Sequence, residues 1–190
     1  TMSEGKTILP FHNCGKAFLI GDPRMEKEKI LFTSESVSEG HPDKVCDQIA
    51  DAILDACIAK DRNVHVACEV FASDNFVMIG GEVSESVINL PFEDIVRDVL
   101  KSIGYDRPEL GTDYHTVEIQ NRMKPQSQDI NRGVCQIKPE EQGAGDQGIM
   151  FGYATTETKG YMPLAISIAH KLVREATRLR KLGEFKGARP

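Results

Sequence analysis

The sequence predicts an α+β fold in which helices pack on a mostly antiparallel sheet. Strand-like and helix-like segments follow one another in the order β, α, β-hairpin, α, β, which favours layered helices on a sheet over a doubly wound parallel sheet. The composition, 40% hydrophobic and 27% charged residues, is that of a globular protein and excludes collagen-like or disordered chains. At 190 residues the chain is longer than one small domain and shorter than two full ones.

The first elements follow a segment without sustained periodicity, residues 1–28, which we interpret as an N-terminal extension. Residues 30–34 are predicted to form a short strand. A helix should begin at Pro42, because proline suits the first helical turn and Asp43 complements the positive end of the helix dipole. Apolar residues then recur at three- and four-residue spacing and should form the buried face of this helix: Val45, Ile49, Ile53 and Ala56.

A β-hairpin is predicted next, with strands at 64–71 and 76–83 separated by Ala72-Ser73-Asp74-Asn75, whose short polar residues favour a turn. If Phe71 lies opposite Phe76, the alternation of side chains places four residues on one face of the sheet: His65, Glu69, Met78 and Glu82. Glu69 and Glu82 would then lie four residues apart along the ladder, about 13 Å at about 3.3 Å per residue. The two carboxylates should therefore serve separate subsites.

The second half begins with an amphipathic helix after Pro91 that should end at Gly104. A strand at 114–120 and a long mobile loop at 121–136, of a length often found in lids, should follow it. The segment 149–155 is strand-like. A last helix is predicted at 163–181, capped by Gly183, with Arg178, Arg180 and Lys181 at its negative end. Its buried side should comprise Leu164, Ile168, Leu172 and Leu179.

Charge and cysteine content narrow the classes of partner. The net charge is −6, so we expect neither a broad nucleic-acid surface nor binding to an anionic membrane. The sequence contains no apolar run of about 18 residues and no secretory signal, which predicts a cytoplasmic protein. The five cysteines have no CxxC spacing, so we expect reduced thiols that act as small buried hydrophobic groups.

The first candidate site is the segment 35–44, which ends in Gly-His-Pro-Asp-Lys at the start of the first helix. His41, Asp43 and Lys44 bring an imidazole, a carboxylate and an ammonium to a helix N-terminus, which attracts anions. His41 and Lys44 could bind a phosphate, while Asp43 with Glu35 could hold a hard cation through oxygen ligands. Helix capping alone also explains this pattern, and both interpretations stay open here.

The second candidate is the glycine-rich segment 143–148, which has the spacing G-x-G-x-x-G. This spacing would suit a dinucleotide-dependent oxidoreductase, but that fingerprint needs a preceding strand and a helix that begins within it. The residues around 143–148 predict neither element. A structural glycine turn remains possible, and Asp146 within the turn could recognise an amine or a metal.

Several motifs, taken in order, closely resemble one known family over residues 30–190, the S-adenosylmethionine synthetases (methionine adenosyltransferases). The motifs are 32–44, Ala67-Cys68-Glu69, Gly80-Gly81-Glu82, Gln126-Ser127, 143–148, 151–155 and Met162-Pro163. The resemblance implies a three-domain pseudo-repeat architecture of similarly folded α+β domains. It would make 29–127 the N-terminal domain, 128–139 a gating loop and linker, and 140–190 the first part of the central domain.

The resemblance also implies the reaction, in which the methionine sulfur displaces the triphosphate of ATP at C5′ and the triphosphate is then hydrolysed to phosphate and pyrophosphate. His41 would be the catalytic contact to the triphosphate, and Lys44 would join it in ATP binding. Asp43, and with it Glu35, would hold Mg²⁺, and Glu69 would bind K⁺. Glu82, Gln126 and Asp146 would contact methionine.

The family's homodimers, or dimers of dimers, carry active sites between subunits, and the resemblance implies the same for this chain. Gln128 stands where the family usually has proline, so the gating loop should be more flexible here. The chain stops at Pro190, where the family continues, so we expect a truncated central domain and negligible turnover of this chain by itself. The alternative is a truncated non-catalytic module that binds nucleotide or pairs with a full-length subunit.

Overall fold

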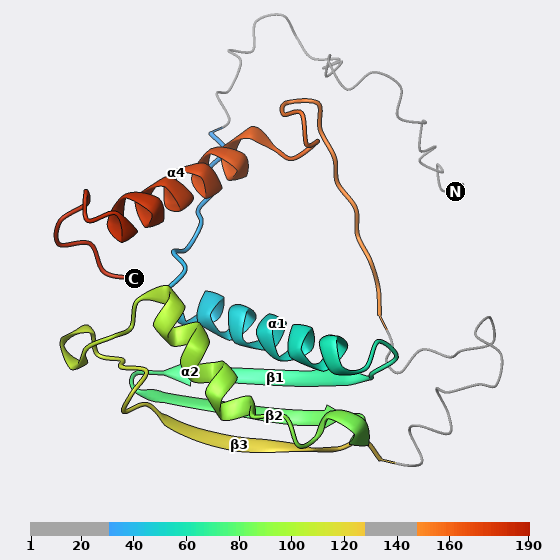
Figure 1. The fold of residues 1–190 in the computed structure, drawn as a ribbon. Helices are drawn as coiled ribbons and strands as arrows, with labels where there is room; N and C mark the ends of the chain where they lie inside the picture. Colours follow the sequence, from blue (N-terminus) through green and yellow to red (C-terminus); the bar gives the residue numbers. More distant parts are fainter. Residues whose placement is uncertain (1–30, 128–147) are drawn as a thin grey trace, which may run out of the picture. The chain divides into compact units, whose positions relative to one another are not determined.

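The computed structural model describes residues 31–127 and 148–190, and the elements below all belong to one structural unit, 33–190 (Figure 1). The first helix, α1 (Pro42–Lys60), begins at the predicted proline. Val45, Ile49 and Ile53 are buried as predicted, and Cys57 rather than Ala56 completes the buried face. No helix in the described ranges has the length and apolar character needed to cross a membrane.

The predicted hairpin forms from β1 (Val66–Ser73) and β2 (Phe76–Val83). Its turn holds only two residues, Asp74 and Asn75, and Asp74 adopts a left-handed backbone with φ 49°. Phe71 therefore lies opposite Met78, not Phe76 as predicted. A register shift of two residues keeps every side chain on its predicted face, because the side-chain period of a strand is two.

The third strand, β3 (Glu118–Pro125), lies beside β2 and parallel to it, so the sheet is mixed and has the order β1-β2-β3. The strand predicted at 114–120 begins four residues later and ends five residues later, so the first five residues of the predicted loop 121–136 belong to β3. Residues Tyr114 and His115 instead form a turn closed by the buried Asp113, whose backbone carbonyl accepts the Val117 N–H at 2.8 Å. The parallel pairing is possible because a helical connection separates β2 from β3.

That connection contains α2 (Phe92–Ile103), which ends at the predicted Gly104 in the left-handed conformation. Helices α1 and α2 lie on the same face of the sheet (Figure 1). The core fills the space between them and consists of these residues: Val45, Ile49, Ile53, Cys57, Val77, Ile79, Val83, Val87, Phe92, Val96, Leu100, Ile103 and Val117. None of the helices in residues 31–127 and 148–190 covers the other face of the sheet (Figure 1).

Three predictions outside this body were wrong. Residues 31–34 and 149–155 have no strand pairing, and side chains such as Phe32 and Phe151 are exposed. A segment with an apolar strand pattern forms a strand only when a neighbouring strand pairs with it. The described sheet provides no partner strand for either segment. The last helix, α4 (Leu164–Lys181), ends at Gly183 as predicted, but Leu164, Ile168 and Leu172 of its predicted buried side are exposed.

Candidate functional site at the start of helix α1

The first turn of α1 is organised by His41, which occupies the N-cap position with an extended backbone. Its Nδ1 atom accepts the backbone N–H of Asp43 at 3.2 Å. In a neutral imidazole the other nitrogen then carries the proton, so Nε2–H is left as a donor. The capping and ligand-binding interpretations of His41 are therefore compatible, since they use different ring nitrogens.

Asp43 and Lys44 follow on the same turn and carry opposite charges. The Asp43 carboxylate lies 3.8 Å from His41 Nδ1 and is 87% exposed. Lys44 forms an ion pair at 2.9 Å with Asp47, one turn further along α1. The helix dipole adds positive potential at this point. The turn can thus accept an anion, and Asp43 offers a carboxylate to a cation.

A cavity of about 560 Å³ opens beside this turn. Glu35 and Lys44 line it, as the sequence grouping suggested, whereas His41 and Asp43 do not. The sequence reasoning missed His170 and Arg174, which α4 contributes to the opposite wall, and His170 Nδ1 lies 2.8 Å from Ser36 Oγ. His170 and Arg174 are four residues apart, so the sequence places them on one face of a helix. The sequence does not indicate which other element this helix face contacts. The complete lining is Glu35, Ser36, Val37, Glu39, Lys44, Gln48, His170, Val173 and Arg174.

Two other predicted site residues, Glu69 and Glu82, lie on the sheet face that points away from the helices. Glu69 pairs with Gly80 and Glu82 with Ala67, so the two carboxylates are diagonal neighbours. Such neighbours lie about 7–8 Å apart, not the predicted 13 Å, because of the two-residue register shift. Gln126 follows β3 at the same end of the sheet, where its backbone N–H donates to the Val83 carbonyl at 2.8 Å.

A glycine explains how Glu82 reaches this position. Gly81, directly before it, has φ +136°, and a Cβ atom there would lie 2.0 Å from the Ala67 carbonyl oxygen. Only glycine fits such a close approach between two strands. The backbone therefore requires the second glycine of the Gly-Gly-Glu motif.

The described residues thus form two separate groups of candidates, one at the start of α1 and one on the outer sheet face. Within the described ranges, no three His, Cys, Asp or Glu side chains come together in a way that could hold a metal ion. Asp146 and the segment 128–139 lie outside the described residues.

The cysteines in the described ranges support the expectation of unreactive thiols. Cys46, Cys57 and Cys68 are free, and burial is the main cause that raises the pKa of each. The pKa of Cys68, on the inner face of β1, rises to about 11. A high pKa keeps a thiol protonated and a poor nucleophile at neutral pH. Cys14 and Cys135 lie outside the described residues.

Fold and helix start together define an α+β domain with an exposed His-Asp-Lys set at a helix N-terminus. The family model of the S-adenosylmethionine synthetase N-terminal domain matches residues 29–128, and that of the central domain of the same family matches residues 141–190. The chain therefore belongs to the S-adenosylmethionine synthetase family.

Curated relatives agree with this assignment. The chain is 56% identical over 163 residues to the S-adenosylmethionine synthases of Mycoplasma capricolum subsp. capricolum and Mycoplasma mycoides subsp. mycoides. It is 54% identical over 160 residues to that of Mesoplasma florum. The first two alignments cover 86% of this chain and the third 84%, and all three span 42% of the relative. The chain thus corresponds to less than half the length of these relatives.

Proposed function

We propose that this chain is the N-terminal part of an enzyme that makes S-adenosylmethionine from ATP and L-methionine and releases phosphate and pyrophosphate. The observation that carries the proposal is the His41, Asp43 and Lys44 set on the first turn of α1, within the segment matched by the N-terminal family model. A set of this kind is suited to a polyphosphate leaving group and its counter-ion.

The reaction depends on positioning the substrates and on neutralising the charge of the triphosphate leaving group more than on proton transfer. A thioether sulfur is already nucleophilic, so no general base is needed to activate it. The leaving triphosphate carries about four negative charges, which preorganised donors and cations must meet. His41 Nε2–H would donate to the triphosphate near the breaking C5′–O bond, and Lys44 would neutralise charge beside it.

Asp43, with Glu35, would hold Mg²⁺. Their donor set fits, because Mg²⁺ in nucleotide sites is bound by one or two carboxylates and completes its shell with substrate phosphates and water. The high exposure of the Asp43 carboxylate leaves room for such a shell. When bound, the ion would offset phosphate charge. Glu69 would contribute to a K⁺ site on the outer sheet face.

On the outer face, Glu82 and Gln126 would bind methionine together with Asp146. The proximity of Gln126 to the end of β2 supports grouping it with Glu82. The carboxylate of Glu82 would meet the ammonium group of methionine, since opposite charges give the stronger hydrogen bonds. The segment 128–139 would act as the gate over this site.

We also propose that the enzyme works in the cytoplasm as a homodimer or a dimer of dimers with active sites at the interface. Phe71 and Met78, both large and apolar, are 55% and 38% exposed on the outer sheet face. Exposed apolar side chains that lie together on a surface are typical of protein contacts. The same face carries Glu69 and Glu82, so a second subunit there would lie beside the methionine residues.

The test is the formation of S-adenosylmethionine by a chain extended to the length of the relatives, supplied with ATP, methionine, Mg²⁺ and K⁺. Asp43→Asn should raise the Mg²⁺ concentration needed for half-maximal rate by about 10-fold, because it removes the charged ligand. Asp55→Asn is the matched control, an exposed aspartate further along α1. The functional proposal fails if the extended chain forms no product, and the role of Asp43 fails if the Mg²⁺ dependence is unchanged.

A further inference from the structure

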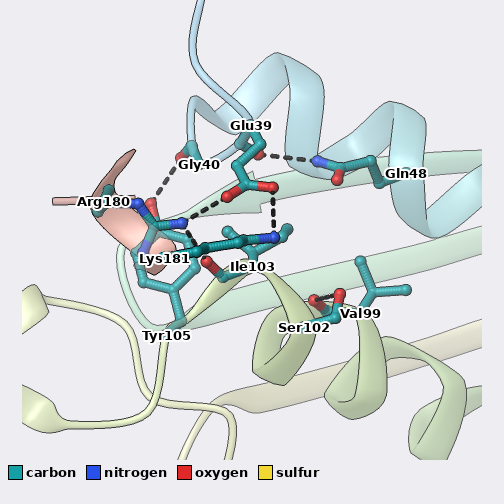
Figure 2. Close-up of polar contacts among 9 residues, drawn as sticks. All are labelled: Glu39, Gly40, Gln48, Val99, Ser102, Ile103, Tyr105, Arg180 and Lys181. Atoms are coloured by element: carbon teal, nitrogen blue, oxygen red, sulfur yellow. Dashed lines mark hydrogen bonds and ion pairs between the residues drawn. The ribbon is translucent and has the colours of Figure 1, made fainter. Parts of the chain in front are cut away.

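A cluster of ion pairs holds Glu39, two residues before His41 (Figure 2). Arg180, on the last turn of α4, donates to Glu39 Oε1 and, at 2.6 Å, to the Ile103 carbonyl at the end of α2. Lys181 donates to Glu39 Oε2 at 3.0 Å. The side chains of Arg180 and Glu39 are only 13% and 19% exposed. Both carboxylate oxygens are thus engaged by cations from one helix end.

The backbone of the same two residues, Glu39 and Gly40, is held as well. Gln48 of α1 donates to the Glu39 carbonyl at 2.8 Å, and the Tyr105 hydroxyl donates to the Gly40 carbonyl at 2.5 Å. Burial raises the pKa of Tyr105, which keeps this donor protonated.

These contacts determine where His41 can lie. Its N–H donates to the Ser38 carbonyl at 3.2 Å, and its own carbonyl accepts the Val45 N–H at 2.8 Å as the first bond of α1. Glu39 and Gly40, the two residues before His41, are held through the Glu39 side chain and through both of their backbone carbonyls. The groups that bind them come from α1, from the end of α2 and from the end of α4. The backbone that leads into His41 is therefore held at two consecutive residues, Glu39 and Gly40.

We propose that Arg180 and Glu39 are positioning residues that act through His41, with Lys181 as the second cation of the pair. This inference rests on the proposed function, in which His41 contacts the leaving triphosphate. Exposed ion pairs contribute little to stability. Loss of Arg180 from the largely buried pair would leave the Glu39 carboxylate with Lys181 alone, whose side chain is 45% exposed. The loop would then move, and a misplacement of about 1 Å at a reacting group can cost about 100-fold in rate.

The first experiment uses the 190-residue chain and does not depend on activity. Arg180→Gln is compared with Arg178→Gln, which removes an exposed pair with Glu175 on the same turn of α4. NMR at one fixed pH would follow the chemical shifts of the His41 ring and the exchange of the Asp43 amide. We expect Arg180→Gln to shift the His41 signals and to speed Asp43 exchange at least 10-fold, and Arg178→Gln to do neither. Unchanged His41 and Asp43 signals in Arg180→Gln would overturn the proposal.

The second experiment measures rates in the chain extended to the length of the relatives. Arg180→Gln should lower kcat by 10- to 100-fold with little change in KM for methionine, and Arg180→Lys should recover part of it. Glu39→Gln should have a similar effect, and the double variant should be no worse than either single one, since the residues act as one unit. A full kcat in Arg180→Gln would overturn the positioning role.

The two proposals can fail separately. If the unsubstituted extended chain forms no product, the proposed function fails, while the NMR comparison still decides whether Arg180 positions His41. If Arg180→Gln does not fold, Glu39→Gln replaces it in both experiments. A variant with lower stability but with His41 signals and kcat of the parent would show a purely structural pair and would contradict the inference.

Discussion

Helices α1 and α4 follow the same sequence pattern with opposite outcomes. In α1, Val45, Ile49 and Ile53 are 0–3% exposed, whereas Leu164 and Ile168 of α4 are 48% and 46% exposed. Both helices begin and end close to where the sequence predicts. Periodicity therefore predicts that a helix forms and which residues share a face, but not whether another element covers that face.

The apolar faces of α1 and α4 differ in burial because different elements lie beside each helix along the chain. Helix α1 is followed at once by the β1–β2 hairpin, whose inner face provides an apolar surface within a few residues. For α4, hydrogen bonds and ion pairs connect its side chains to this body: Ser36 with His170, and Glu39 with Arg180 and Lys181. The α1 region is held by apolar packing, and α4 is joined to it by charge.

The largest effect should come from a matched pair of truncations on the two helices. Ile53→Ala removes a fully buried side chain and should cost about 2–5 kcal/mol in free energy of unfolding, because it leaves a cavity. Leu172→Ala removes a side chain that is 67% exposed and should cost less than about 0.5 kcal/mol. Urea unfolding followed by circular dichroism measures both. Equal costs would show that the apolar face of α4 is buried in solution.

A second pair compares glycines at positive φ in the two regions. Gly81→Ala in β2 combines φ +136° with a Cβ atom 2.0 Å from a backbone oxygen, and should cost about 3 kcal/mol. Gly183→Ala after α4 has φ +74° and open space around it, so only the backbone strain of about 1 kcal/mol remains. The same unfolding experiment tests them, and a cost at Gly81 no larger than at Gly183 would contradict the tight strand contact.

The fold could be predicted where neighbours along the chain supply the packing. The hairpin and the two helices that cover it were found, and the two-residue error in register left the faces of Glu69 and Glu82 correct. The order of the strands and the parallel pairing of β3 could not be predicted. The residues of a crossover connection do not indicate which strand the following strand pairs with, or in which register. The segments 31–34 and 149–155 failed for the same reason, since alternation alone does not supply a partner strand.

The candidate site could be predicted where its residues are consecutive. His41, Asp43 and Lys44 lie on one helical turn, so the sequence places them together. Residues brought in from α4 were missed, because Arg180 meets Glu39 across 141 positions. Arg180 had been interpreted only as a cation that complements its own helix dipole. The partner of a long-range ion pair depends on tertiary packing. The local sequence pattern around Arg180 therefore cannot predict that partner.

The smallest effects should appear at the starts of the two helices, where neither region uses a Ser, Thr, Asp or Asn cap. In α1 the His41 ring accepts the Asp43 N–H, and in α4 the Glu157 carboxylate accepts the Leu164 N–H at 2.8 Å. His41→Ala should cost about 1 kcal/mol in free energy of unfolding, because it exposes an unpaired helix donor. Glu157→Ala should cost about 0.5 kcal/mol, since an exposed carboxylate near a helix start contributes little more.

His41→Ser separates the two uses of the imidazole. Serine is a good N-cap, so this variant should keep the stability that His41→Ala loses, with the Asp43 amide still protected from exchange. It has no Nε2–H to offer a triphosphate, so in a chain of the relatives' length it should remain as inactive as His41→Ala. Recovery of both stability and activity in His41→Ser would mean that His41 is only a cap. If His41→Ser recovers stability but not activity, the imidazole has a second use besides the capping bond made by Nδ1. Nε2 would then be the group that acts on the ligand.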